Sequence, residues 1–249
     1  NALEKTILNS RNKRKSTKLR INSSINHLNL YKPNKSSLYQ SNLSKTTKVK
    51  VFNCKKNDNT STLKIAFKLN FDMFDNKYYS LFALDYILIH DLGSLLLKHL
   101  RTNKQLIYDI SSQILVDELF DNMGYYIFTT TIDSSKILEV NKGFFEAINF
   151  VLQGKFKVPY MKKYYDYIEQ ILLVKKENLN INNIINSYSR YHLYNKKIVT
   201  DKEKELKFKN VKYDDIIKIA QQTFTRNNLI IGYSSKKNIN KNIEKLFDY

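Results

Sequence analysis

The clearest pattern in the chain is an alternation over residues 63–71, in which a large apolar side chain occupies every second position. The apolar face holds Leu63, Ile65, Phe67, Leu69 and Phe71, and the opposite face holds Lys64, Ala66, Lys68 and Asn70. A period of two predicts a strand with one buried face, as in an antiparallel sheet. Shorter apolar or alternating runs predict four more strands, at residues 49–53, 106–116, 125–132 and 229–233.

Helical patterns fill most of the remaining chain. A long apolar segment over residues 76–100 predicts a buried helix that is interrupted at Gly93 and Ser94. Further helices are expected over residues 133–153, 159–177, 181–194 and 211–224, with a charged helix from about residue 239. Strands and helices are largely segregated along the chain. This order predicts an α+β fold: a mainly antiparallel sheet of about five strands with helices packed on one side.

Charge divides the chain into two parts. Residues 1–50 carry 12 Lys and Arg against the single acid Glu4, a net charge of +11, whereas the other 199 residues carry 30 basic and 22 acidic residues, a net charge of +8. Residues 1–47 are also rich in Ser and Asn and lack a sustained apolar period. We therefore expect a basic, partly disordered linker or arm over residues 1–47, with a transit peptide as the alternative, and a folded domain over residues 48–249.

Several kinds of site and location are disfavoured by the composition. The single cysteine, Cys54, excludes an internal disulfide and a Cys-rich zinc site. No apolar run reaches the roughly 18–20 residues of a membrane span. The sequence does not fix the compartment, although the lack of a signal-peptide pattern favours an intracellular location over secretion. None of the four histidines lies in a His-x-x-Glu-His or His-Glu-x-x-His pattern, so we expect no metal site and no cofactor in this chain.

One pair of polar side chains brackets the turn at residues 102–104. Arg101 ends the long helix, and Tyr108 is expected early in the strand that follows. A guanidinium and a phenol at the rim of a sheet are two hydrogen-bond donors that could face one substrate group. A structural role also accounts for both residues, because Arg is favourable at a helix C-terminus and Tyr is common in strands.

The stretch around this pair resembles the C-terminal substrate-contact motif of the M16 metallopeptidase family (insulinase, pitrilysin and mitochondrial processing peptidase). In that family a Leu-Arg pair is followed, seven residues after the Arg, by a Tyr, with Gln-Leu or Gly-Leu between them. Leu100-Arg101, Gln105-Leu106 and Tyr108 stand at those places here, and Ile107 stands where the family usually has a small residue. The resemblance extends over residues 48–235 and includes a Gly-Ser-Leu step at residues 93–95.

The resemblance implies a half-domain of a larger enzyme. In M16 peptidases two similar halves enclose the substrate; the N-terminal half binds zinc through His-x-x-Glu-His, and the C-terminal half lacks the metal and supplies part of the cavity wall. This chain would be the C-terminal half, inactive alone, with zinc in a partner half upstream or on another chain. Arg101 would then hold a backbone carbonyl of the peptide substrate. Tyr108 would donate to the oxygen on which negative charge develops as water attacks.

Two other functions remain open at this stage. The chain could be a catalytically inactive M16-like scaffold subunit. It could also be a basic nucleic-acid-binding protein that binds through residues 1–50, a reading disfavoured because its lysines and aromatic residues are not interleaved in a known binding motif. If the chain binds a peptide substrate, the strand at residues 63–71 or its neighbour is a further candidate to pair with that extended peptide.

Overall fold

The computed structural model describes residues 49–117, 123–156, 158–177 and 181–247. The described residues belong to one compact unit, Thr46–Tyr249. The predicted arm at residues 1–47 lies outside the described residues, so the boundary at residue 48 remains a prediction.

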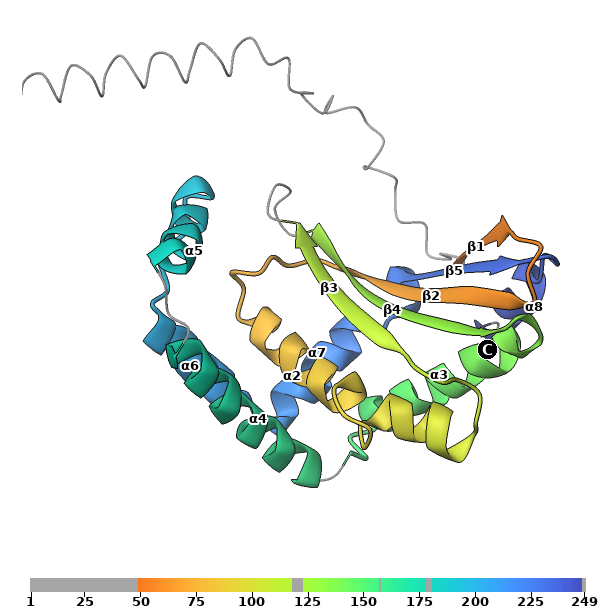
Figure 1. Ribbon diagram of the computed structural model, residues 1–249, viewed down its shortest axis with the longest axis horizontal. Coiled ribbons are helices and arrows are strands. Elements are labelled where there is room, and N and C mark those ends of the chain that lie inside the picture. Colours follow the sequence, from red (N-terminus) through yellow and green to blue (C-terminus); the bar gives the residue numbers. More distant parts are fainter. Residues whose placement is uncertain (1–48, 118–122, 157, 178–180, 248–249) are drawn as a thin grey trace, which may run out of the picture. The chain divides into compact units, whose positions relative to one another are not determined.

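A five-stranded sheet forms the centre of this unit. Its strands are β1 (Lys50–Lys55), β2 (Thr60–Leu69), β3 (Ser111–Asp117), β4 (Met123–Asp133) and β5 (Leu229–Ser235). They lie in the order β1-β5-β2-β4-β3 (Figure 1). The pairings β2–β4, β2–β5 and β3–β4 are antiparallel, and only β1–β5 among the described strands is parallel. The predicted mainly antiparallel sheet of about five strands is confirmed.

Helices account for most of the rest of the described chain. The α-helices are α2 (Lys77–Ile89), α3 (Ile137–Leu152), α4 (Val158–Glu177), α5 (Ile181–Leu193), α6 (Asp201–Lys209), α7 (Tyr213–Thr223) and α8 (Asn240–Glu244). The shorter helical segments are the π-helix η1 (Leu97–Asn103) and the 3₁₀ turns η2 (Ser134–Lys136), η3 (Arg226–Asn228) and η4 (Lys245–Phe247). Figure 1 shows α2, α3 and α7 against the same face of the sheet, with α4 outside α2. The predicted α+β fold with helices on one side is therefore confirmed.

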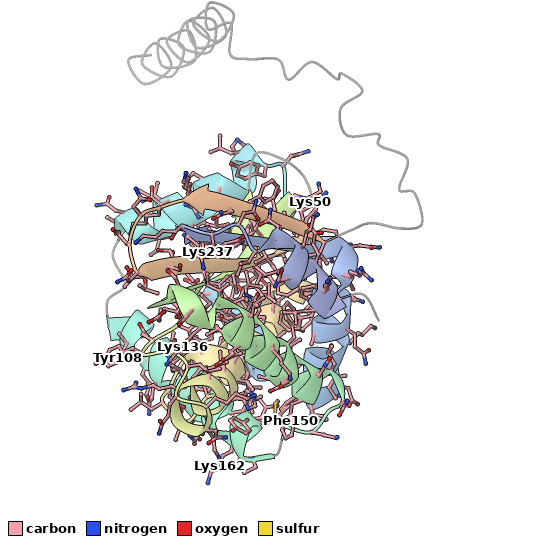
Figure 2. All side chains as sticks on the ribbon, turned by 90° about the vertical axis from the view of Figure 1, so that its right-hand side faces the viewer. Lys50, Tyr108, Lys136, Phe150, Lys162 and Lys237 are labelled. Atoms are coloured by element: carbon pink, nitrogen blue, oxygen red, sulfur yellow. The ribbon has the colours of Figure 1, made fainter. Side chains whose placement is uncertain are left out.

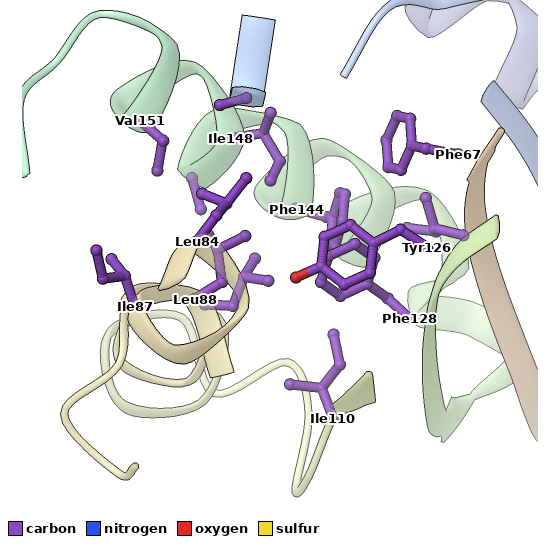
Figure 3. Close-up of a cluster of buried hydrophobic side chains, with 14 of the residues drawn as sticks. Phe67, Leu84, Ile87, Leu88, Ile110, Tyr126, Phe128, Phe144, Ile148 and Val151 are labelled. Atoms are coloured by element: carbon purple, nitrogen blue, oxygen red, sulfur yellow. The ribbon is translucent and has the colours of Figure 1, made fainter. Parts of the chain in front are cut away.

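The core lies between that face of the sheet and the helices. The alternation predicted for β2 is present: its side chains from Leu63 to Leu69 are buried at every second position. Figure 3 shows Phe67, Tyr126 and Phe128 of the sheet meeting Phe144 of α3. The ring centroids of Phe128 and Phe144 lie 4.9 Å apart at 71°, an edge-to-face arrangement that favours aromatic pairs.

Three details differ from the sequence-based expectations. The strand expected from residue 106 begins at Ser111, so Tyr108 lies in the connecting loop and not early in a strand. The reason is that Ile107 and Ile110 are both buried, and a spacing of three does not suit a strand with one buried face. Second, β2 lies between β5 and β4, so both of its edges are already hydrogen-bonded and it cannot accept a peptide. Third, α6 was not expected at all.

Across the described ranges, every helix falls short of the length or the apolar character that a membrane crossing requires.

Candidate functional site

The chain reverses direction between η1 and β3, and Arg101 and Tyr108 lie on either side of this reversal. Leu97 and Leu100 of η1 are buried, which fixes the orientation of the segment and leaves Arg101 on its partly exposed side. The Leu106 amide donates to the Leu100 carbonyl at 2.9 Å and closes the turn. Gln105 has a φ of 51°, a left-handed conformation that is uncommon outside glycine. Short π-helical segments occur often at functional sites.

The turn brings the two predicted site residues together. The guanidinium carbon of Arg101 lies 5.0 Å from the centroid of the Tyr108 ring, within the range of a cation–π contact. Tyr108 is 80% exposed, and Figure 2 shows it at the margin of the domain. Its neighbours Ile107 and Ile110 are buried, so the loop is anchored in the core on both sides of the tyrosine. Ile107 thus replaces the family's small residue while its side chain faces inward, and the pair still forms.

Both polar groups are available to a ligand. Within the described part of the chain, neither the Arg101 guanidinium nor the Tyr108 hydroxyl has a hydrogen-bond or ion-pair partner in the protein. A buried or structural arginine normally pairs its fork of donors with a carboxylate or carbonyl. The two side chains therefore present unused donors from an anchored backbone.

Helix α3 supports the turn from behind. Glu146 accepts hydrogen bonds from Lys104 Nζ at 2.6 Å and from His99 Nε2 at 3.1 Å. The hydrogen bond from Lys104, followed by that from His99, holds the pKa of the Glu146 carboxyl below its usual value. A Cβ on Gly143 would lie 2.7 Å from Leu100 Cδ2, so this glycine allows η1 to approach α3 closely. Neither Gly143 nor Glu146 was singled out from the sequence; a glycine within an apolar helical stripe was the available signal.

A second network fastens α2 to the strands. The Asp85 carboxylate accepts hydrogen bonds from Ser112 Oγ at 2.5 Å and from the Tyr126 hydroxyl at 2.8 Å. Burial raises the pKa of the Asp85 carboxyl, and these two hydrogen bonds offset that rise only in part. Because Ser112 lies at the start of β3, the network also fixes where the loop that carries Tyr108 ends. The sequence signal was a lone carboxylate inside a buried apolar helix.

Two of the described histidines, His90 and His99, contact other side chains. His90 lies against Tyr167 and Tyr86, with ring centroids 4.2 Å and 5.0 Å apart, and His99 contacts Glu146. In the ranges that the structure describes, no three His, Cys, Asp or Glu side chains are grouped as a metal site would require.

Known proteins resemble this chain in sequence and in fold. A family whose description is "Peptidase M16 inactive domain" matches residues 10–163. The fold is similar to that of a peptidase M16 inactive domain from Pseudomonas fluorescens, with 12% identity, a TM-score of 0.64, and 77% of this chain and 44% of that chain covered. It is similar to a protease from Helicobacter pylori, with 13% identity, a TM-score of 0.66, and 77% and 45% covered. It is also similar to a chain of Complex III2 from Candida albicans, with 10% identity, a TM-score of 0.62, and 80% and 49% covered.

These structural relatives share the fold, and the chain spans less than half the length of each of the three. No curated protein matches the chain.

Proposed function

Because the chain belongs to the M16 peptidase family as its inactive C-terminal half-domain, we propose that it forms one wall of a peptide-binding cavity, opposite a zinc-bearing half. Membership of the family implies that partner half, either upstream on the same polypeptide or on a separate chain. In this arrangement the partner supplies the zinc and the general base, and this chain supplies contacts to the peptide.

The observation that carries the proposal is the pair of the partly exposed Arg101 and the exposed Tyr108, whose donors have no protein partner among the described residues. The guanidinium of Arg101 binds a backbone carbonyl of the substrate through its fork of N–H groups. The Tyr108 hydroxyl donates to the oxygen that becomes negative when water attacks the scissile carbonyl. Donors aimed at developing charge lower the barrier by a few kcal/mol, so each is worth roughly 10²–10³ in rate.

The division of labour between the two halves is tested by measuring zinc content and zinc-dependent peptide cleavage. Both are measured on residues 1–249 alone and on the native assembly or full-length parent that contains this chain. We expect no stoichiometric zinc and no cleavage with the chain alone, and both in the assembly. Stoichiometric zinc together with cleavage by residues 1–249 alone would contradict the proposal.

The second candidate is an inactive scaffold subunit. The similarity to a chain of Complex III2 favours it, because that structure is described as a complex. The scaffold reading predicts an assembly without peptidase activity and no rate effect of Arg101→Ala.

The nucleic-acid reading depends on residues 1–50, where most of the excess charge lies, and predicts binding that weakens steeply with salt.

A further inference from the structure

A pocket of about 790 Å³ opens beside η1, between that segment, α3 and the start of α4. We call it the η1–α3–α4 pocket and define it by Leu95, Lys98, Ala147, Phe150, Lys155 and Tyr160. Neither Arg101 nor Tyr108 lines it, so it is a separate surface from the candidate site. Figure 2 labels Phe150 of α3 and Lys162 of α4.

The floor of the pocket is apolar and partly open to solvent. Leu95, Ala147 and Tyr160 line it and are buried or half-buried. Phe150 is 43% exposed and Leu92 is 72% exposed at its border. Large apolar side chains that gather at a concavity with a polar border mark an interaction site more often than scattered ones do.

The border of the pocket is cationic. Lys98, Lys155 and Lys163 all line it and are exposed. Lys163 is paired with Asp91 at 3.2 Å, whereas Lys98 and Lys155 make no ion pair with any described residue. The one glutamate of the lining, Glu146, is already paired with Lys104 and His99. The two unpaired ammonium groups therefore leave the border with a positive charge that the chain itself does not balance there.

We propose that the η1–α3–α4 pocket docks an acidic segment of a partner polypeptide, in which an aromatic or large aliphatic side chain enters the pocket and flanking carboxylates meet Lys98 and Lys155. An apolar centre with a polar, exposed border is the anatomy of a protein–protein contact with one anchoring side chain. A small-molecule site instead converges several buried polar groups on its ligand. The lysines of this pocket lie at its exposed border instead of its floor.

Charge selects the partner. The full chain has a net charge of +19, and its first 50 residues have +11, so a second copy or the chain's own basic segment would bring like charge to the border. Like charges across a contact oppose binding, and complementary charges speed encounter and fix register. An acidic segment from a different polypeptide meets both requirements. The proposal does not depend on the proposed peptidase role, because it uses none of the residues assigned to that role.

The test uses the full chain and a fluorescein-labelled peptide, acetyl-Glu-Asp-Leu-Phe-Asp-Glu, with fluorescence anisotropy at near-physiological salt. We expect saturable binding that the double variant Lys98→Glu/Lys155→Glu weakens about tenfold or more and that Phe150→Ser weakens similarly. The matched control is Lys162→Glu, an exposed lysine next to Lys163 that does not line the pocket; it should change the affinity less than about twofold. A peptide with Ser-Ser in place of Leu-Phe controls for attraction to the overall charge.

Four results would overturn the proposal. They are no saturable binding of the acidic peptide, equal binding of the Ser-Ser peptide, equal weakening by Lys162→Glu, and unchanged binding in Phe150→Ser. A further result would also overturn the proposal. If dodecanoate binds although the peptide does not, and Phe150→Ser abolishes that binding, the pocket takes a small amphiphile. Because all four substituted side chains are exposed, circular dichroism should report the wild-type fold for every variant.

Discussion

Arg101 and Tyr108 lie against each other across the η1–β3 turn, with the guanidinium carbon 5.0 Å from the centre of the phenol ring. The contact joins the partly exposed arginine of η1 to the exposed tyrosine, which lies on a loop that Ile107 and Ile110 anchor in the core. A cation–π contact at an exposed position contributes only about 0.5–1 kcal/mol. The anchored loop and the backing by α3 must therefore hold the pair in place.

Gly143 is the position at which that backing is most sensitive. An Ala at this position places a Cβ 2.7 Å from Leu100 Cδ2 and 3.3 Å from Lys104 Cδ. Leu100 is fully buried and has little room to move, so we expect Gly143→Ala to lower the free energy of unfolding by about 1–3 kcal/mol, despite the better helix propensity of alanine. Chemical denaturation measures this change. Gly232→Ala is the control, because a Cβ there meets no atom within 4 Å; equal effects of the two substitutions would refute the close approach.

Ile107 should behave as a core residue. Its side chain is 8% exposed, so Ile107→Ala removes buried methyl groups and should lower the free energy of unfolding by about 2–5 kcal/mol. Leu92→Ala, at a position that is 72% exposed, should change it by less than about 0.5 kcal/mol. Thermal or urea unfolding of both variants checks the difference. A neutral Ile107→Ala would mean that the loop is not anchored in the core.

Asp85 should make stability depend on pH. Burial raises the pKa of its carboxyl in the folded state, so the folded chain holds this proton more tightly than the unfolded chain does. An Asp carboxyl in an unfolded chain has a pKa of about 4. As the pH rises from this value to the higher pKa of the folded state, the Asp85 carboxyl therefore lowers the free energy of unfolding. Below about pH 4 the carboxyl is protonated in both states, so it does not make the free energy of unfolding depend on pH.

Asp85→Asn isolates this effect, because the amide oxygen still accepts hydrogen bonds from Ser112 and Tyr126 but does not ionise. The free energy of unfolding of the wild type, minus that of Asp85→Asn, should fall as the pH rises from 4 to 7. Asp85→Ala should instead be destabilised at every pH by about 1–3 kcal/mol, since the buried Tyr126 hydroxyl loses its acceptor. Urea unfolding across that pH range gives the free energy of unfolding of the wild type and of both variants. If the wild-type value minus that of Asp85→Asn rises with pH, the account is contradicted.

Local patterns predicted most of the elements correctly because their periods are local. The alternation at β2 and the apolar stripe of α3 both reflect one buried face, and both appear in the structure. The pairing of β1 with β5 could not be predicted, because parallel partners far apart in the chain leave no local signature. The missed helix α6 did leave one: Thr200 and Glu203 form a capping box, in which each side chain accepts a hydrogen bond from the backbone of the other.

The sequence named two candidate site residues, but it did not predict their geometry. The resemblance pointed to Arg101 and Tyr108, and the structure brings them together, but the sequence placed Tyr108 within a strand. The π-helical hydrogen bonding of η1 and the left-handed Gln105 decide where the chain turns, and neither follows from an apolar period. Glu146 supports the turn through a hydrogen bond with His99, which lies 47 residues away in the sequence, and no local pattern encodes such a contact.

The most direct test of the proposed function is the kcat/KM for peptide cleavage by the native assembly that carries Arg101→Ala or Tyr108→Phe, normalised to bound zinc. Lys142→Ala and Tyr125→Phe serve as matched controls, since both side chains are exposed and lie outside the pair. The account predicts a loss of roughly 10²–10³ for each site variant with zinc content unchanged, and control rates within about twofold of the wild type. Site variants that cleave as fast as the controls would contradict the assignment of Arg101 and Tyr108 to the substrate cavity.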